Sequence, residues 1–391
     1  MTLRPRSTCL YPYAHHLSRA LTPLSVVFVI FTALPGLAHA EAPAVASGKA
    51  FNPDVSVNFL GLLRHDTAAS EDRATAPYNG LSLQEAEIQF FSPVDAYLNA
   101  VALFSIEEEN GEFGIDPEEV YLETTTLPYV TVRAGKYKLA LGKHNQLHTH
   151  AFPFIDAPLF QTKITGDEGL NASAVSAAAL LPLPWFSELT VQGYSLANEA
   201  LYGDASTTPG TTVGAPTGKA GFLTRYRNLW EFGDDATLEF GLSGAKGKNA
   251  YGRNTTAVGG DLTLKWRPAE GGKYHALIWN TEYLRATRLG RLDPGGSGLN
   301  DARIGGAATY VQVQFAERWW IQARAEILGL PKNDVEPNHT KQSALLAFFP
   351  SEFSGFRLQV DHERDHARPK SDHAVTLQYN VTIGAHPAHA Y

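Results

Sequence analysis

The sequence predicts an all-β fold, a transmembrane antiparallel up-and-down β-barrel of about 16 strands. Three observations predict it: strands with alternating polarity, connections that alternate in length, and an export signal at the N-terminus. In residues 374–383, Val375 and Leu377 fall on one face of an extended chain, while Thr376 and Gln378 fall on the other. This period of two recurs along the chain, as expected for a barrel that is apolar outside and hydrated inside.

The N-terminal segment 1–40 has the features of a secretory signal peptide. Basic residues precede an apolar stretch at 24–34, and Ala38-His39-Ala40 forms a small-x-small cleavage site. The apolar stretch is too short for a helix that must cross roughly 30 Å of hydrocarbon. We therefore expect cleavage after Ala40, with residues 41–391 forming an exported outer-membrane β-barrel.

Composition narrows the functional classes. The single cysteine, Cys9, and the single methionine, Met1, precede the expected cleavage site, so disulfides and thiol catalysis are not expected. Loss of three arginines and no acids changes the formal charge from −8 to −11, which disfavours nucleic acid and anionic lipid as partners. The sequence carries no nucleophile elbow, glycine-rich phosphate loop or zinc-protease helix motif, so we do not expect an enzyme.

The connections alternate between short turns and longer polar segments. The short ones are 92–95, 128–129, 181–185, 228–235, 267–272, 316–318 and 350–354. The longer ones are 64–80, 107–117, 141–170, 198–218, 246–255, 285–301, 329–340 and 364–371. Strict alternation is typical of outer-membrane barrels, in which tight periplasmic turns lie opposite the longer outer loops.

Most tryptophans lie at or next to the predicted short turns. These are Trp185, Trp230, Trp266, Trp319 and Trp320, whereas Trp279 lies within a strand. Aromatic residues gathered at one rim indicate a girdle at a membrane interface. The alternative is a soluble, secreted β-sandwich in which the tryptophans cover the core.

Strand alternation also predicts which charged residues face the lumen. The acids on this face are Glu85, Glu87, Glu119, Glu123, Glu188, Glu239, Asp261, Glu282, Glu326, Asp361 and Glu363. The bases are Arg133, Arg225, Arg227, Lys265, Arg324 and Arg357. The excess of acids favours a weak preference for cations, although the narrowest ring of a pore decides its selectivity.

The longest connection, 141–170, is the third outer loop in this scheme. It contains apolar side chains, among them Phe152, Phe154 and Ile155, that need a place to be buried. Folding inward against the barrel wall would bury them and narrow the pore. We therefore expect a constriction at this loop, formed by its polar residues His144, His148, His150 and Asp156.

Part of this loop has the residue types of a metal site. His148 and His150 are two residues apart in an extended segment, and Asp156 follows nearby. Imidazole and carboxylate ligands suit Zn²⁺, so His148, His150 and Asp156 are candidate ligands and Zn²⁺ is the candidate cofactor. The alternative is that these histidines are polar constriction residues that hydrogen-bond to the backbone.

These features resemble the porin superfamily, in which the third outer loop commonly folds into the barrel. The chain is more closely similar to porin-like proteins near the phosphate-selective porins, whose members are also labelled zinc-regulated or TonB-dependent outer-membrane receptors. The resemblance rests on Phe51-Asn52-Pro53-Asp54-Val55-Ser56, on His148-Thr149-His150 with Asp156-Ala157-Pro158, and on Gly384-Ala385-His386-Pro387-Ala388-His389-Ala390-Tyr391. Phosphate selectivity implies a ladder of basic lumen residues, whereas the predicted lumen here is rich in acids. A TonB-dependent receptor implies an N-terminal plug domain, for which the sequence leaves no room.

The sequence therefore predicts a porin-like channel of the Gram-negative outer membrane, through which small hydrophilic solutes or ions diffuse passively. Outer-membrane lipid and these solutes are the expected partners, and nucleic acid is not. Porins are often trimers, so a homotrimer is an open alternative to a monomer. The alternative function is an outer-membrane metal (zinc) uptake receptor that binds its cargo at the third-loop histidines.

Overall fold

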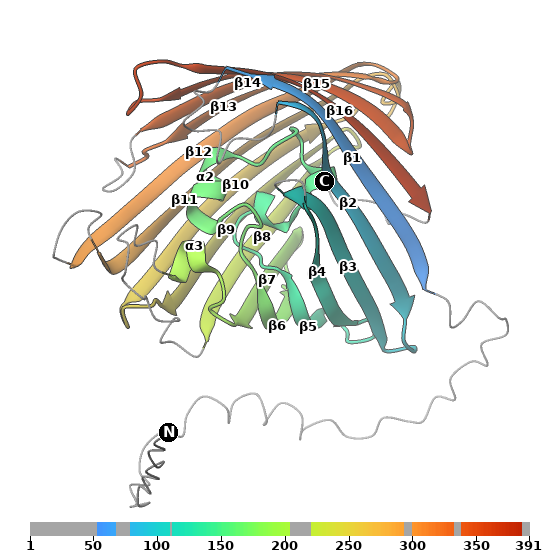
Figure 1. Ribbon diagram of the computed structural model, residues 1–391. Helices are drawn as coiled ribbons and strands as arrows, with labels where there is room; N and C mark the ends of the chain where they lie inside the picture. The colour runs from blue at the N-terminus through green and yellow to red at the C-terminus, as the bar shows by residue number, and fades with distance from the viewer. Residues whose placement is uncertain are drawn as a thin grey trace, which may run out of the picture. The chain divides into compact units, whose positions relative to one another are not determined.

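Sixteen antiparallel strands close into one barrel in the computed structural model (Figure 1). The structure describes residues 53–67, 79–109, 112–203, 220–292, 299–331 and 338–384, and the predicted signal peptide 1–40 lies outside them. Each strand pairs with its neighbours in sequence, and the first strand closes the sheet by pairing with the last. The predicted up-and-down barrel is thereby confirmed, and the alternative of two stacked sheets is wrong.

The strands follow the alternating segments of the sequence. The first eight are β1 (Asp54–Asp66), β2 (Gly80–Pro93), β3 (Leu98–Glu109), β4 (Glu112–Thr124), β5 (Val130–Lys138), β6 (Asn171–Leu180), β7 (Phe186–Tyr194) and β8 (Gly221–Phe232). The second eight are β9 (Ala236–Lys248), β10 (Asn254–Trp266), β11 (Ala276–Leu292), β12 (Leu299–Ala316), β13 (Trp319–Leu328), β14 (His339–Ser351), β15 (Ser354–Asp365) and β16 (Asp372–Gly384).

The two faces of the sheet differ in polarity as alternation predicts. On β16, the outward side chains of Val375 and Leu377 are 47% and 39% exposed, whereas those of Thr376 and Gln378 are 1% and 0% exposed. Large apolar side chains are exposed in the same way around the barrel. Among the described residues, no helix is long and apolar enough to span a bilayer. The outer surface of the sheet is thus the apolar one.

Several predicted loops are shorter because the strands continue past the predicted ends. The predicted loop 107–117 shrinks to the two residues between β3 and β4, since Glu107 to Glu109 pair with Glu112 to Gly114. Strands β9 and β10 likewise extend into the predicted loop 246–255, and strands β11 and β12 extend into the predicted loop 285–301. Polar residues satisfy ladder hydrogen bonds as well as apolar ones do, so a polar composition does not by itself end a strand.

Register shifts interrupt strict alternation in several strand pairs, and those in β4 and β2 turn additional side chains inward. In β4, Leu103 pairs with Glu119 and Phe104 with Pro117, which leaves Glu118 as an extra residue. In β2, a register shift opposite Leu60 and Gly61 leaves Gln84 as the extra residue. A bulge turns two consecutive side chains towards the same face. Glu118 and Gln84 therefore face the interior, although strand parity assigned them to the outer face.

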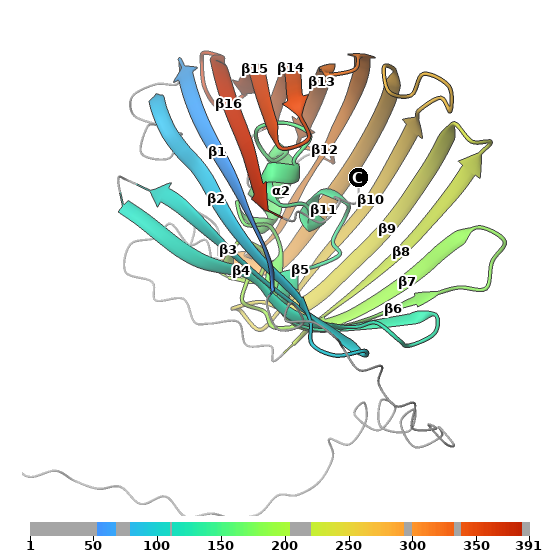
Figure 2. The same ribbon diagram turned by 90° about the vertical axis from the view of Figure 1, so that its right-hand side faces the viewer.

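The connection between β5 and β6, residues 139–170, is called the third loop from here on. It carries two 3₁₀ turns, η1 (His144–Gln146) and η2 (Thr149–Ala151), and helix α2 (Leu159–Thr165). Figures 1 and 2 show α2 and its flanking chain inside the barrel. The next long connection carries a short helix, α3 (Glu199–Tyr202).

The buried core lies where the third loop meets the inner wall. Phe160 and Ile164 of α2 pack in one cluster with Leu284, Ile304 and Leu328 of strands β11 to β13. A second cluster joins Phe154 and Ile155 to Leu345 and Ala347 of β14. Burial of these side chains is the main apolar contribution to holding the loop inside the barrel.

Candidate pore and third-loop constriction

The third loop turns into the barrel at Gly142. This residue has φ of 80°, and a Cβ atom there would lie 2.0 Å from Oε1 of Glu282. Glycine is therefore required both for the backbone conformation and for the close approach to the wall. The next two backbone N–H groups, of Lys143 and His144, donate to the Glu282 carboxylate at 2.9 and 3.0 Å. Lys143 also contacts Glu239, with Nζ 3.1 Å from Oε1.

Asp156 anchors the loop on the opposite wall. Its carboxylate accepts hydrogen bonds from Arg324 at 2.9 Å, from Lys341 at 2.5 Å and from Gln359 at 2.6 Å. Burial raises the pKa of Asp156, but the charges of Arg324 and Lys341 outweigh it and hold the pKa below its usual value. Leu159 continues this attachment by donating its backbone N–H to Glu326 at 2.6 Å.

His148 and His150 attach the loop to a third part of the wall. Nδ1 of His148 lies 2.7 Å from Oε2 of Glu118, and Nδ1 of His150 lies 2.8 Å from Oε2 of Glu87. The two rings stack with centroids 6.1 Å apart. Burial lowers the pKa of His148, but hydrogen bonds to Glu118 and Glu119 dominate and raise it to about 10. The His148 imidazole is therefore charged at neutral pH.

His144 lies in a different environment. Its ring packs against Phe152 with centroids 4.5 Å apart, and its Nε2 atom is buried without a hydrogen-bond partner. Burial, together with the charges of Arg324 and Lys138, lowers the pKa of His144 to about 3. This histidine is therefore neutral over the physiological range.

The structure brings only part of the predicted metal trio together. His148 and His150 are neighbours, but Asp156 is held by Arg324 and Lys341 instead of facing them. The prediction failed for Asp156 because this half-buried carboxylate takes the nearest strong cations, and sequence spacing does not show those. In the described part of the chain, one donor atom each from Glu87, Glu118 and His148 lie within 4.8 Å of one another.

The ten wall residues singled out as lumen-lining all have buried or half-buried side chains. They are Glu85, Glu87, Glu119, Glu123, Arg133, Arg225, Arg227, Arg324, Glu326 and Arg357. Many are paired: Arg133 with Glu123 at 2.6 Å, Arg225 with Asp261 at 2.8 Å, Arg227 with Glu188 at 3.2 Å, and Arg324 with Glu326 at 2.8 Å. Pairing removes much of the charge that a solute would otherwise meet.

Further charged residues of the interior escaped sequence reasoning, among them Glu118, Lys138 and Lys341. Glu118 was missed because of the β4 bulge, for which Pro117 inside a strand was the available signal. Lys138 lies 3.6 Å from Glu118, and Lys341 contacts Asp156. Both lysines lie at strand ends next to predicted loops, where alternation could not be followed.

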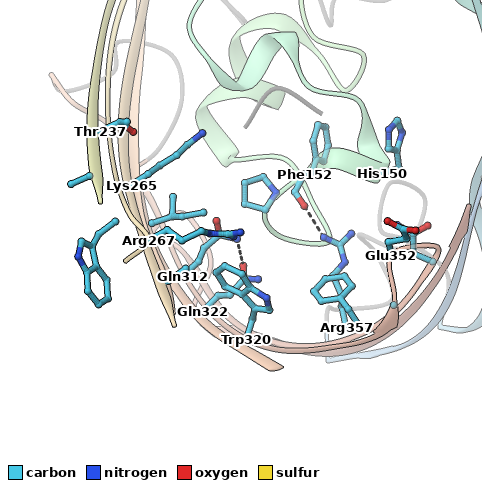
Figure 3. A pocket seen from close by; sticks show the side chains of 18 of the residues that line it. His150, Phe152, Thr237, Lys265, Arg267, Gln312, Trp320, Gln322, Glu352 and Arg357 are labelled. Atoms are coloured by element: carbon cyan, nitrogen blue, oxygen red, sulfur yellow. Dashed lines mark hydrogen bonds between the residues drawn. The ribbon is translucent and has the colours of Figure 1, made fainter. Parts of the chain in front are cut away.

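A cavity of about 830 Å³ opens below the third loop (Figure 3). It is lined by His150, Phe152 and Pro153 of the loop and by short-turn residues such as Asp234 and Glu352. Its wall mixes cationic, amide and aromatic side chains, which include Lys265, Arg267, Arg357, Gln312, Gln322 and Trp320. Arg357 donates to the Phe152 carbonyl at 2.7 Å, and Gln312 donates to Gln322 at 2.9 Å (Figure 3).

A second, narrow space of about 50 Å³ lies beside the loop. It is lined by Lys143, His144 and Glu282. Pro153, Lys265, Ile278 and Gln312 line both spaces. The shared residues indicate that open space continues upward between the third loop and strands β10 to β12.

The tryptophans support the prediction of an aromatic girdle at the rim that carries the short turns. Trp185, Trp266 and Trp319 are 38%, 42% and 38% exposed, and each lies at a short turn. Trp230 packs against Trp185 with ring centroids 6.2 Å apart. Trp320 departs from the predicted girdle, because alternation along β13 turns it inward to line the large cavity.

The closed sixteen-stranded antiparallel barrel is similar in fold to solved outer-membrane porins. The chain is similar to the outer-membrane channel DcaP of Acinetobacter baumannii, with a TM-score of 0.58, 11% identity, and 87% of this chain and 99% of that chain covered. It is also similar to the anion-selective porin from Comamonas acidovorans, with a TM-score of 0.54 and 11% identity, where 85% of this chain and 100% of that chain are covered. A third similar structure is a trimer form of OmpT, an outer-membrane protein of Vibrio cholerae, with a TM-score of 0.51 and 10% identity, where 85% of this chain and 99% of that chain are covered. At these identities the similarity shows a shared fold.

No protein-family model matches the chain. A protein of uncharacterised function from Aquifex aeolicus (strain VF5) is 28% identical over 396 residues, which cover 88% of this chain and 81% of that protein. The finer resemblance to the phosphate-selective porins is not confirmed by these comparisons.

Proposed function

We propose that this protein is an outer-membrane porin-like channel through which small hydrophilic solutes or ions diffuse passively. The observation that carries the proposal is the 830 Å³ cavity beneath the third loop, which shares lining residues with the narrow space beside Lys143 and Glu282. A hydrated path inside a barrel with an apolar outer face is what such a channel requires. The apolar outer face and the predicted signal peptide also support the proposed location in the outer membrane.

The narrowest part of the proposed path lies on the side of strands β10 to β12. Lys143, Lys265 and Glu282 line this gap, and Glu239 is bound to Lys143. Acids and bases are balanced there, and a balanced ring favours weak selectivity. We propose a weak preference for cations, because acids outnumber bases on the wall as a whole. The excess of acids over bases is smaller than the sequence predicted, because Lys138 and Lys341 are also buried in the interior and strand alternation did not assign them there.

Single-channel recording of the refolded chain 41–391 tests this proposal. We expect ohmic conductance in simple salts and, across a salt gradient, a small reversal potential of the sign for cations. A protein that inserts and carries no current would rule out the channel. A reversal potential of the opposite sign would overturn the cation preference and leave the channel standing.

We also propose that the channel assembles as a homotrimer, as in the trimer form of OmpT from Vibrio cholerae. Light scattering on the detergent-solubilised protein measures the assembled mass. A mass of one chain would exclude the trimer.

A metal-uptake receptor is the second candidate function. It is favoured by one observation, the convergence of Glu87, Glu118 and His148. A receptor for zinc would bind the ion saturably and show no ohmic current, so the recording above separates the two functions.

A further inference from the structure

Two wall carboxylates and one loop imidazole converge where the third loop meets strands β2 and β4. Glu87 comes from β2, Glu118 from the β4 bulge and His148 from the segment between η1 and η2. The Glu87 and Glu118 side chains are 1% and 2% exposed, and that of His148 is 15% exposed. Their donor atoms lie within 4.8 Å of one another. Donors on one tetrahedral Zn²⁺ lie roughly 3.4 Å apart, so small side-chain rotations would complete the site.

Buried carboxylate oxygens without partners provide a second, independent observation. Oε1 of Glu85 and Oε1 of Glu87 have no hydrogen-bond partner, although the residues are only 2% and 1% exposed. Glu85 is close enough to Glu87 and Glu118 to interact with both electrostatically. A buried carboxylate oxygen without a donor is costly. A cation bound by Glu87 would supply the partner that its Oε1 atom lacks.

The local charges lead to the same conclusion. Glu85, Glu87, Glu118 and Glu119 are all buried at this contact. Lys138 is the nearby lysine, with Nζ 3.6 Å from Oε1 of Glu118. Even with both imidazoles charged, one lysine and two histidines carry three positive charges against four carboxylates, so one negative charge is left over unless an acid binds a proton. A divalent ion would neutralise two carboxylate charges directly.

The neighbouring groups are placed as outer partners of a metal site. Nδ1 of His150 lies 2.8 Å from Oε2 of Glu87, and Nε2 of His148 lies 3.5 Å from Oε2 of Glu119. Such hydrogen bonds orient metal-bound carboxylates and fix the tautomer of a metal-bound histidine. His150 is thus a positioning residue here, whereas the sequence predicted it as a ligand.

We infer that His148, Glu87 and Glu118 bind one divalent transition-metal ion of the Zn²⁺ type, which ties the third loop to β2 and β4. One imidazole nitrogen and two carboxylates form a ligand set suited to Zn²⁺, with a position left for water. Binding itself does not depend on the proposed channel function, whereas any effect of the ion on conductance does. The ion would hold the loop from the side opposite the narrow space.

Zinc titration of the untagged, refolded chain tests the site. The parent protein for the test carries His362→Ala and His373→Ala, because these exposed histidines have Nδ1 atoms 3.4 Å apart and form a competing candidate site. We expect His148→Ala and Glu118→Gln each to weaken Zn²⁺ binding by more than about tenfold. Glu188→Gln, which removes a lumen carboxylate paired with Arg227, is the matched control and should leave Zn²⁺ affinity unchanged.

Cobalt provides a second readout that reports the coordinating atoms. Co²⁺ in a site with nitrogen and oxygen ligands should give visible absorption in the parent and lose it in His148→Ala. Since His148 lies in a loop, its replacement keeps the test available if Glu118→Gln does not refold. Equal Zn²⁺ affinity in the parent and in His148→Ala would overturn the inference, as would a parent that binds no Zn²⁺.

Channel recording separates this inference from the proposed function. Zn²⁺ binding at His148 without ionic current would support the site and contradict the channel. Ionic current without Zn²⁺ binding would support the channel and contradict the metal site.

Discussion

Several charged residues inside this barrel hold the third loop. Asp156 binds Arg324, Lys341 and Gln359, while Glu282 accepts two backbone N–H groups of the loop. A lumen residue bound in this way contributes less field to a passing ion than an isolated charge does. Counting lumen charges from the sequence therefore overstates selectivity.

Replacing Asp156 by asparagine should loosen the loop. The change leaves the positive charges of Arg324 and Lys341 without the carboxylate that they share. Breaking a fully buried pair costs about 3–5 kcal/mol, and the 32% exposure of the Asp156 side chain reduces this to about 1–3 kcal/mol. Urea unfolding in detergent micelles measures the loss.

The matched control is Glu188→Gln, which breaks the more exposed pair with Arg227. Exposed pairs contribute less than about 1 kcal/mol, so this variant should remain close to the parent. Equal losses in the two variants would show that Asp156 has no special role in anchoring the loop.

His144 should make the loop sensitive to acid. Its pKa is lowered to about 3 in the folded protein, chiefly by burial, against about 6.5 when the loop is released. The neutral ring therefore stabilises the folded loop above pH 6.5, and this contribution is lost as pH falls from 6.5 towards 3. The slope approaches about 1.4 kcal/mol per pH unit for one proton.

Thermal unfolding between pH 7 and pH 5 checks this prediction, because this range spans the ordinary pKa of histidine, where the expected loss begins. His144→Gln removes the titrating ring and should show a smaller fall in midpoint temperature than the parent. The groups around His144 that also carry charge include Arg324, Lys138, Asp156 and Glu282, and the variant leaves all of them in place. Identical pH profiles would disprove the assignment to His144.

At the scale of elements, alternation alone predicted the strands and most of their inward residues. It predicted Arg324 and Glu326 because β13 runs without interruption, so every second residue faces the interior. It failed at Glu118, where one extra residue in β4 turns two neighbours inward. A bulge depends on pairing with another strand, and a single segment of sequence carries only an indirect sign of it, such as Pro117.

The third loop shows a second limit of sequence reasoning. Apolar residues such as Phe154 and Ile155 indicate that the loop must be buried, because burial depends on composition. Its partners depend on which strands surround it, so the contacts of Asp156 and His148 could not be derived. The histidines were recognised as a group, whereas their carboxylate partners came from distant strands.

Shortening the third loop should enlarge the pore and leave the barrel intact. Lys138 pairs with Asn171, and the N–H of Leu139 donates to Leu170 at 2.9 Å. The strand ends are therefore close enough for a short glycine-serine linker to replace residues 143–166. Single-channel conductance should rise severalfold, since water would replace the loop side chains that belong to the two core clusters, namely Phe154, Ile155, Phe160 and Ile164.

The same linker in place of residues 366–371 is the control, because this connection lies outside the third loop. That variant should conduct like the parent. Unchanged conductance after the third loop is shortened would show that the loop does not limit the current.

At the scale of the whole molecule, closure decides what the outer surface must contact. The pairing of β1 with β16 leaves no sheet edge, so all sixteen strands present their backbone hydrogen bonds to one another. What remains on the outside is an apolar surface that includes Phe59, Val360 and Leu377. Exposed side chains of this kind favour hydrocarbon over water.

Leu377→Arg should therefore impair insertion into lipid. Leu377 lies near the middle of β16, and an arginine at the bilayer midplane of a barrel costs about 2–4 kcal/mol. His373→Arg, on the same outward face but at the end of the strand, should cost about 0–1 kcal/mol. Folding into lipid vesicles, followed by urea unfolding, measures both. If the two variants lost equal stability, position along the strand would not matter, and the outer face would not be in contact with a bilayer.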